Sequence, residues 1–165
     1  MMITLTGFMG SGKTTVGKVL ADFLGCPFMD LDDLVVKKAG KSIPDIFAQD
    51  GEPAFRELEA QVLRKTVEKY AESTAVLALG GGAVLAPASA VLLREKTVCI
   101  YLRATLDTLL ARLAGETAGR PLADDALAER LASREPIYEK TAHVIIDTDG
   151  LSPDEVADEI IISAL

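Results

Sequence analysis

Short apolar runs alternate with segments of helical periodicity along the whole chain. The runs that predict strands are Met2 to Thr6, Pro27 to Asp30, Thr74 to Leu79, Thr97 to Leu102 and His143 to Asp147. Runs of this kind are typical of parallel strands that are buried on both faces. The helical segments are Lys13 to Leu24, Asp32 to Ala39, Ser42 to Asp50, Pro53 to Glu72, Pro87 to Lys96, Thr105 to Ala114, Asp125 to Glu135 and one that starts after Ser152. The alternation predicts an α/β fold, a five-stranded parallel sheet flanked by helices on both faces.

Several predicted helix ends carry residues that suit those positions. Gly25 and Gly40 follow helices at a point where a left-handed C-cap is common. Pro53 suits a first helical turn, because a backbone N–H has no helical partner there. Ser152 and Glu155 form the pattern of a capping box before the last helix.

The length of 165 residues predicts a single domain, residues 1–165. One stretch, Ala75 to Leu93, carries no charge and is long enough to cross a bilayer. It contains Gly80 to Gly82 and Pro87, which cost a helix roughly 6 kcal/mol relative to alanine. A buried strand, a glycine turn and a short helix are therefore predicted here instead of a membrane span.

The formal net charge of −8 argues against binding to nucleic acid or to an anionic membrane. If the ligands are anions, positive charge must be concentrated at their site. The two cysteines, Cys26 and Cys99, lie far apart and form no C-x-x-C pair. They predict free thiols in a reducing compartment, and we expect a cytoplasmic protein without a signal peptide.

A phosphate-binding motif follows the first predicted strand. Gly7-Phe8-Met9-Gly10-Ser11-Gly12-Lys13-Thr14 matches G-x-x-x-x-G-K-[ST] and leads into a helix. Its glycines let backbone N–H groups surround phosphates at the helix N-terminus. Lys13 would neutralise the β- and γ-phosphates, and the Thr14 hydroxyl would bind one Mg²⁺ ion. The nucleotide-binding residues predicted here are Gly10, Ser11, Gly12, Lys13, Thr14 and Thr15.

Other features narrow the class of P-loop protein. The chain contains no asparagine, so the N-K-x-D motif by which GTPases recognise guanine is absent. Two predicted strands end in aspartate, at Asp30 and at Asp147. Asp30 comes soon after the P-loop helix and is expected to lie beside the P-loop. The small size favours a compact kinase of the nucleoside-monophosphate-kinase type.

Four further motifs occur in order along the chain. They are Asp30-Leu31-Asp32, Phe55-Arg56, Gly80-Gly81-Gly82 and Arg120-Pro121-Leu122. Together with the P-loop they resemble shikimate kinase, and the resemblance covers essentially the whole chain. It implies a parallel five-stranded sheet, acceptor-binding helices over about 32–61 and a mobile lid over about 115–124. It also implies that ATP phosphorylates the 3-hydroxyl of shikimate, giving shikimate 3-phosphate and ADP in aromatic amino-acid biosynthesis.

The resemblance assigns roles to the polar residues of these motifs. Asp30 would hold magnesium through water, and Asp32 would orient the acceptor hydroxyl or act as its general base. The alternative for this pair is a solvated acidic turn, with Asp33 capping the helix. Arg56 and Arg134 would grip the shikimate carboxylate, since guanidinium binds carboxylate with two parallel hydrogen bonds. The alternative for both is an ion pair on a helix surface, for Arg56 with Glu52 or Glu59.

The remaining assignments also come from the resemblance. The backbone of Gly80, Gly81 and Gly82 would approach the substrate, and Phe47 and Phe55 would wall its ring. Arg120, in the lid, would stabilise charge in the transition state. Arg112 and Pro153 would sandwich adenine. Outside these roles, His143 is interpreted as structural, and Lys37, Lys38 and Lys41 as a solvated face.

Two other functions remain possible at this point. A kinase for another small hydroxy acid, such as gluconate, would share the P-loop. A non-catalytic nucleotide-binding module would also share it, although Lys13, Asp32 and Arg120 argue against that function. The partners expected are ATP and shikimate, and the protein is expected to be a monomer.

Overall fold

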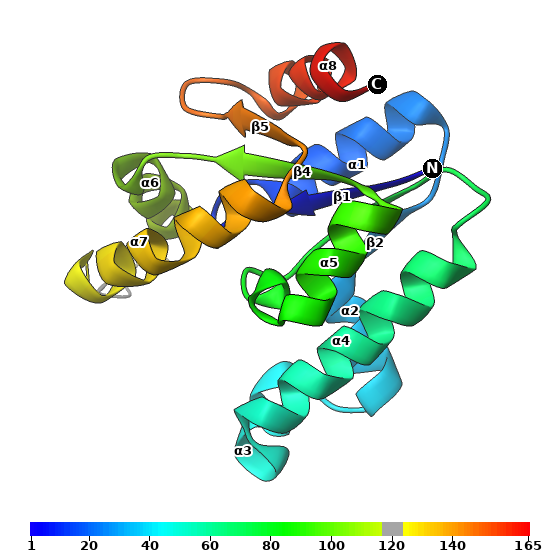
Figure 1. Ribbon diagram of the computed structural model, residues 1–165. Helices are drawn as coiled ribbons and strands as arrows, with labels where there is room; N and C mark the ends of the chain where they lie inside the picture. Colours follow the sequence, from blue (N-terminus) through cyan, green and yellow to red (C-terminus); the bar gives the residue numbers. More distant parts are fainter. Residues whose placement is uncertain (117–123) are drawn as a thin grey trace.

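The computed structural model describes residues 1–116 and 124–165. Its sheet contains five strands in the order β2-β3-β1-β4-β5, and every neighbouring pair is parallel. The strands are β1 (Met2–Thr6), β2 (Phe28–Asp30), β3 (Ala75–Ala78), β4 (Val98–Arg103) and β5 (Val144–Asp147). The predicted α/β fold with a five-stranded parallel sheet is confirmed (Figure 1).

Eight α-helices connect and cover these strands in the part of the chain that is described. They are α1 (Lys13–Leu24), α2 (Leu31–Ala39), α3 (Ile43–Asp50), α4 (Glu52–Lys69), α5 (Pro87–Lys96), α6 (Leu106–Glu116), α7 (Asp124–Thr141) and α8 (Pro153–Ala164), with a 3₁₀ turn, η1 (Ala83–Leu85). Most boundaries lie within three residues of those predicted. The Glu155 N–H donates to the Ser152 hydroxyl at 3.2 Å, so the predicted cap of the last helix forms.

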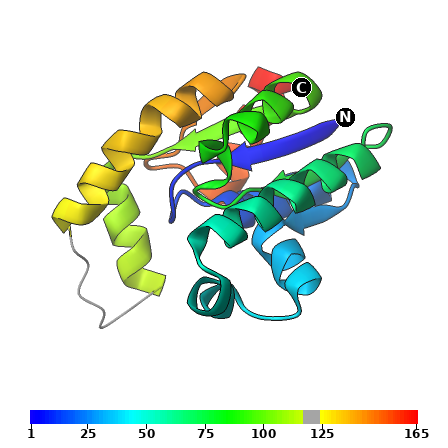
Figure 2. The same cartoon turned by 60° about the horizontal axis from the view of Figure 1, so that its bottom comes forward.

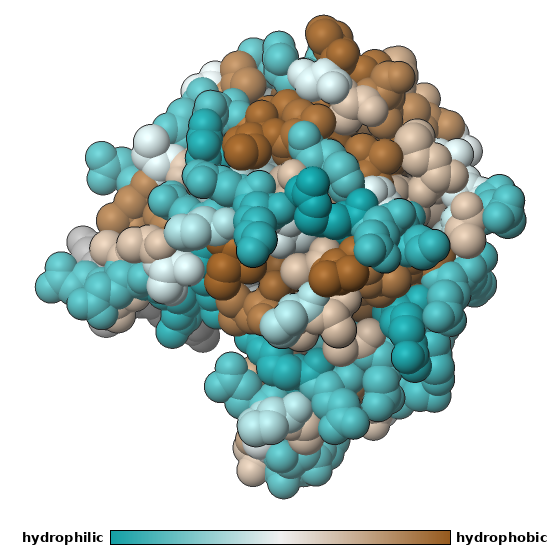
Figure 3. All heavy atoms as spheres, in the orientation of Figure 1, coloured by the Kyte–Doolittle hydropathy of each residue, from teal (hydrophilic) through white to brown (hydrophobic). Residues whose placement is uncertain are grey.

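Helices cover both faces of the sheet because the strands are apolar on both sides. On one face, Leu5 and Ile100 pack with Leu20 of α1 and Ile160 of α8. On the other face, buried side chains from α4, α5 and α7 meet the strands; they include Leu63, Leu93, Tyr138, Leu77 and Tyr101. Figures 1 and 2 show α4, α5 and α7 on the face of the sheet opposite to α1 and α8. The outer surface over α3 and α4 is largely hydrophilic (Figure 3).

Helix α7 extends beyond its predicted end. Its predicted end is Glu135. Pro136 follows directly, and a proline inside a helix costs about 3 kcal/mol. The helix nevertheless continues to Thr141, with Pro136 inside it. Tyr138, two residues after Pro136, is fully buried against Tyr101, with ring centroids 5.0 Å apart. This burial offsets the cost of the proline and keeps the last turns of α7 on the sheet.

The uncharged stretch from Ala75 to Leu93 does not form one helix. It contains the buried strand β3, the glycine turn, η1 and the first part of α5, as predicted. No helix among residues 1–116 and 124–165 has the length and apolar character needed to cross a membrane.

The parallel sheet brings the sequence motifs together at one edge. The P-loop follows β1, Asp30 ends β2, and Gly80 to Gly82 follow β3. Since β3 and β1 are neighbours and β2 pairs with β3, all three motifs lie at the carboxyl ends of adjacent strands. Ligands of open α/β sheets bind at this edge. Most of the predicted lid, including Arg120, lies outside the described residues.

Candidate active site

The P-loop has the backbone shape that its glycines predict. Gly10 and Gly12 have φ angles of 80° and 93°, which residues with a Cβ rarely adopt. The Lys13 ammonium lies inside the loop and donates to the carbonyl oxygens of Gly7 at 2.7 Å and Phe8 at 2.9 Å. These bonds hold the cationic group at the centre of the loop that is expected to surround the phosphates.

Burial lowers the pKa of Lys13 to about 8, although the nearby carboxylates of Asp32 and Asp30 raise it. The charged form is therefore disfavoured in the folded protein relative to the unfolded chain. This penalty on stability is present below pH 8 and is relieved as the pH rises from about 8 to the ordinary value of 10.5. The P-loop motif predicts that nucleotide phosphates bind the charged form, so nucleotide binding should weaken as the pH rises above about 8.

We expect the dissociation constant of MgATP to rise about tenfold between pH 7 and pH 9, because most Lys13 side chains lose their proton in that range. Calorimetric titration with MgATP at both pH values measures the change. A Lys13→Arg variant is the matched control, because arginine stays charged and its affinity should change less with pH. Equal affinity of the unmodified protein at pH 7 and pH 9 would contradict this account of Lys13.

A hydroxyl and a carboxylate meet beside the P-loop. The Thr14 hydroxyl donates to Asp30 Oδ2 at 3.0 Å, and the Asp32 N–H donates to Asp30 Oδ1 at 2.9 Å. Asp30 is thus the N-cap of α2, and the suggestion that Asp33 caps this helix is wrong. Oxygen donors of these two kinds, with room for water, are what Mg²⁺ prefers. The predicted metal residues therefore fit a magnesium ion.

A pocket of about 270 Å³ adjoins the outer side of the P-loop. Its lining residues are Gly10, Ser11, Gly12, Thr15, Val16, Arg112, Thr148, Leu151, Pro153 and Val156. The Arg112 guanidinium donates to the Thr148 hydroxyl and carbonyl oxygen, each at 3.2 Å, and to the Gly10 carbonyl oxygen at 3.3 Å. Arg112 and Pro153, predicted from distant parts of the chain, thus line one pocket. Thr148 and Leu151 also line this pocket, although they were not among the predicted nucleotide-binding residues.

A second pocket, of about 250 Å³, lies on the inner side of the P-loop. It is lined by Met9, Asp32, Ile43, Phe55, Arg56, Glu59, Gly80, Gly81, Gly82, Arg130 and Arg134. We call it the acceptor pocket. It unites the predicted acid, both predicted arginines and the three glycines. Phe47 does not line it but packs on Phe55, with ring centroids 4.9 Å apart.

Asp32 lies between the P-loop and the arginines. Burial is the main factor that raises the pKa of Asp32, with a further increase from Asp30, while Lys13 and Arg56 act in the opposite direction. A carboxylate with a raised pKa accepts a proton more readily than a solvated one. The geometry leaves both predicted roles of Asp32 open, because orientation and proton removal need the same position.

Arg56 both forms an ion pair and lines the acceptor pocket. Its Nη1 donates to Glu59 Oε1 at 2.9 Å, and its Nε lies 3.8 Å from Glu52 Oε1. Glu59 is buried, and among the described residues its Oε2 has no hydrogen-bond partner. Burial raises the pKa of Glu59, although its hydrogen bond with Arg56 lowers it. The sequence suggested Glu59 only as a possible partner of Arg56 on the helix surface. In the structure Glu59 is a buried acid that lines the acceptor pocket.

Gly82 leaves space for the Arg56 guanidinium. A Cβ at position 82 would lie 2.6 Å from Arg56 Cζ and closer still to Arg56 Nη2. The φ angle of Gly82 is −106°, which alanine adopts without strain. A side chain here would therefore act mainly by moving Arg56.

For Gly82→Ala we expect the KM for the acceptor substrate to rise about tenfold, equivalent to about 1.4 kcal/mol, while the KM for the nucleotide stays within about twofold. Steady-state kinetics with each substrate varied in turn measures both constants, and a melting curve checks the fold. A similar rise in both KM values would show that the substitution disturbs the whole edge of the sheet.

Tyr138 links α7 to the glycine turn. Its buried hydroxyl donates to the Gly81 carbonyl oxygen at 2.5 Å. Arg134, one turn earlier on α7, lies with its Cζ 5.8 Å from the centre of the Phe8 ring. Helix α7 thus places an arginine in the acceptor pocket and anchors the turn that forms its opposite wall. No local sequence pattern indicates the role of Tyr138, because that role depends on a contact between distant segments.

His143 makes hydrogen-bond contacts to the backbone, as expected for a residue with a structural role. Its Nδ1 accepts from the Cys99 N–H at 3.0 Å, and its Nε2 lies 3.0 Å from the Arg94 carbonyl oxygen. These contacts fix the start of β5 against β4. His143 does not line either of the two pockets beside the P-loop.

The chain is similar to known proteins along nearly its whole length. Residues 9–164 match the family model described as shikimate kinase. A shikimate kinase from Enterococcus faecalis is 43% identical over 164 residues, covering 96% of this chain and 95% of that protein. One from Geobacter sulfurreducens is 47% identical over 163 residues, covering 96% and 87%. A solved shikimate kinase from Acinetobacter baumannii, in complex with shikimate, has a TM-score of 0.87 and 34% identity, covering 97% of this chain and 90% of that one.

Proposed function

The chain belongs to the shikimate kinase family, and from this premise we propose how its two pockets share the reaction. The enzyme transfers the γ-phosphate of ATP to the 3-hydroxyl of shikimate, forming shikimate 3-phosphate and ADP. The match to shikimate kinases extends over nearly the full chain, so a gluconate kinase or a non-catalytic nucleotide-binding module is not favoured. The pocket lined by Arg112 and Pro153 takes the adenosine, and the acceptor pocket takes shikimate.

The main support for placing shikimate in the acceptor pocket is the arrangement of charged side chains there. Asp32 lies near Lys13 of the P-loop, and Arg56 and Arg134 line the same pocket. The pocket also contains Glu59, which pairs with Arg56, and Arg130. A hydroxy acid needs these groups: a carboxylate for its reacting hydroxyl and guanidinium groups for its own carboxylate. The arrangement also explains how a chain with net charge −8 binds two anions.

In the complex, Arg56 and Arg134 bind the shikimate carboxylate and fix the direction of the ring. The apolar side chains of Phe55 and Ile43 contact the ring carbons. This orientation directs the 3-hydroxyl to Asp32, which accepts its hydrogen bond and aims the oxygen at the γ-phosphorus. Positioning of this kind supplies much of the catalysis in phosphoryl transfer.

The phosphates lie in the P-loop, where the Lys13 ammonium neutralises charge on the β- and γ-groups. We propose that Thr14 and Asp30, the latter through water, hold one Mg²⁺ ion. When bound, the ion neutralises phosphate charge and fixes the phosphate oxygens. We further propose that Arg120 contacts the transferring phosphoryl group, as the resemblance implies. A guanidinium group at this position stabilises the charge that is spread over the phosphoryl oxygens in the transition state.

We also propose a cytoplasmic, monomeric enzyme. Both Cys26 and Cys99 are free thiols, and burial raises the pKa of Cys99 to about 11, so this thiol stays protonated and unreactive. Sedimentation of the purified protein measures the mass in solution. The proposal predicts a single species near 17.5 kDa.

A coupled assay of ADP release tests the proposed function. Shikimate should support turnover, and gluconate at the same concentration should not, because it offers no rigid ring that places a hydroxyl and a carboxylate at a fixed separation. A shikimate analogue without its carboxylate should lose affinity and keep the requirement for ATP. Turnover of gluconate at a comparable rate would show that the acceptor pocket recognises another class of hydroxy acid.

A further inference from the structure

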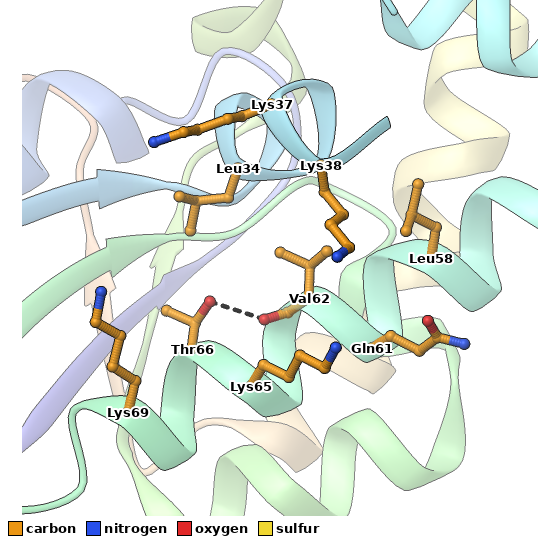
Figure 4. Close-up of a pocket in the computed structure, with 9 residues that line it drawn as sticks. All are labelled: Leu34, Lys37, Lys38, Leu58, Gln61, Val62, Lys65, Thr66 and Lys69. Atoms are coloured by element: carbon orange, nitrogen blue, oxygen red, sulfur yellow. Dashed lines mark hydrogen bonds between the residues drawn. The ribbon is translucent and has the colours of Figure 1, made fainter. Parts of the chain in front are cut away.

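A separate pocket of about 380 Å³ lies between α2 and α4. Leu34, Leu58 and Val62 give it an apolar wall. Thr66 also lines it, but the Thr66 hydroxyl donates to the Val62 carbonyl oxygen at 2.7 Å and needs no partner from a ligand. Figure 4 shows these side chains between the two helices. The wall therefore offers hydrocarbon surface to whatever enters.

The charged side chains that line this pocket are all cationic: Lys37, Lys38, Lys65 and Lys69. The whole chain has the opposite balance, with 25 acidic and 17 basic residues. In residues 1–116 and 124–165, none of these four lysines forms an ion pair. Nearby Lys41, by contrast, pairs with Asp50 at 2.5 Å. The pocket thus concentrates positive charge that the described parts of the protein do not neutralise.

Helix stability explains only part of this charge. Lys37 and Lys38 lie in the last turn of α2 and Lys69 in the last turn of α4, where cations offset the helix dipole. Lys65 precedes the last turn of α4, and at helical spacing it meets one opposite charge, Glu68, and one like charge, Lys69. These two neighbours offset each other, so helix stability does not account for a lysine on this wall of the pocket.

We propose that this pocket binds a small aromatic carboxylate. The ring would lie on Leu34, Leu58 and Val62, and the carboxylate would lie among the lysine ammonium groups. Figure 4 shows the amino groups of Lys38 and Lys65 on the same side of the pocket, near Val62. Lysine stems pack along flat apolar surface while their ammonium groups face an anion or an aromatic ring. Charge complementarity and the apolar wall together select this class of ligand.

This ligand can bind together with both substrates. No residue lines both this pocket and the acceptor pocket, and none is shared with the pocket beside Arg112. Even so, Leu34 lies two residues after Asp32, and Leu58 lies two residues after Arg56. The ligand would therefore bridge the two helices that carry the acceptor-binding residues, without entering the acceptor pocket.

The test is calorimetric titration of the full chain in the presence of saturating shikimate and ADP. The probes are 2-naphthoate and its neutral counterpart, 2-naphthamide. The proposal predicts saturable binding of naphthoate at one site, and at least tenfold weaker binding of naphthamide. Absence of saturable naphthoate binding, equal binding of both probes or displacement by shikimate would each overturn the proposal.

Matched double variants locate the site. Lys38→Glu/Lys65→Glu should weaken naphthoate binding at least tenfold, whereas Lys96→Glu/Lys140→Glu, with the same change in net charge away from the pocket, should stay within twofold. Both variants should keep kcat, because none of these residues contacts a substrate. If the first variant does not fold, Lys38→Gln/Lys65→Gln replaces it with the same expected direction. Equal losses in the pocket and control variants, or binding of an acidic peptide in place of naphthoate, would contradict the proposal.

Discussion

Replacing Asp32 with asparagine should lower kcat roughly 100- to 10,000-fold while MgATP still binds with nearly unchanged affinity. Asparagine keeps the size of the side chain but removes the charge that orients the acceptor hydroxyl and accepts its proton. Single-turnover measurement of phosphoryl transfer, with nucleotide binding measured by calorimetry, separates the two effects. Asp33→Asn is the matched control, because Asp33 is the exposed neighbour on the same helix and should leave kcat unchanged.

The same substitution should stabilise the fold at neutral pH. Burial raises the pKa of Asp32, so its ionised form costs stability once the pH exceeds that raised pKa. Asp32→Asn removes this cost, and its melting temperature should exceed that of the unmodified protein at pH 7. The difference should disappear as the pH falls well below 3.8, the ordinary pKa of the group, where Asp32 is protonated in both the folded and unfolded states. A lower melting temperature at pH 7, or full turnover, would show that Asp32 has a structural role instead.

Replacing Arg56 with lysine should raise the KM for shikimate roughly 100-fold and leave the KM for ATP within about twofold. Lysine keeps the charge but cannot form two parallel hydrogen bonds to a carboxylate, and hydrogen bonds to charged groups contribute about 1.5–3 kcal/mol. The substitution should also weaken the contact with Glu59. Arg56 Nη1 donates to Glu59 Oε1 at 2.9 Å, and a lysine ammonium cannot reproduce the planar geometry of this hydrogen bond. Steady-state kinetics with each substrate varied in turn measures both constants.

Arg64→Lys provides the control for this variant. Arg64 lies on the same helix, is exposed and does not line the acceptor pocket, so the same chemical change should have little effect there. If Arg56→Lys raised both KM values equally, Arg56 would serve the structure of α4 and would not recognise the acceptor. If neither value changed, Arg134 alone would bind the carboxylate.

The features that the sequence predicted correctly depend on local chemistry. The P-loop, the strand Met2–Thr6 and the helix Lys13–Leu24 have signals contained within a few adjacent residues. Parallel strand order then brings Asp30 and the glycines after β3 to the same edge as the P-loop. The P-loop and Asp30 could therefore be placed together from the residues alone. The predicted arginines of both pockets, together with Phe55 and Pro153, were expected only from the resemblance to a known family.

The features that the sequence did not predict depend on packing between distant segments. Glu59 is buried only because α4 lies against the turn at Gly80, and Tyr138 acts through its bond to Gly81, 57 residues away. Helix α7 continues past its predicted end at Glu135, and local preference could not reveal the burial of Tyr138. The lysines along α2 and α4 have the periodicity of a solvated face, and only the distance between the two helices reveals the pocket between them.

A crystal structure of the protein with ADP and shikimate tests the central claim most directly. The account predicts that the shikimate carboxylate lies between Arg56 and Arg134, with its 3-hydroxyl within hydrogen-bond distance of Asp32 and directed at the phosphate end of the nucleotide. A shikimate molecule with its carboxylate away from both arginines, or with another hydroxyl at Asp32, would contradict the proposed division of the site.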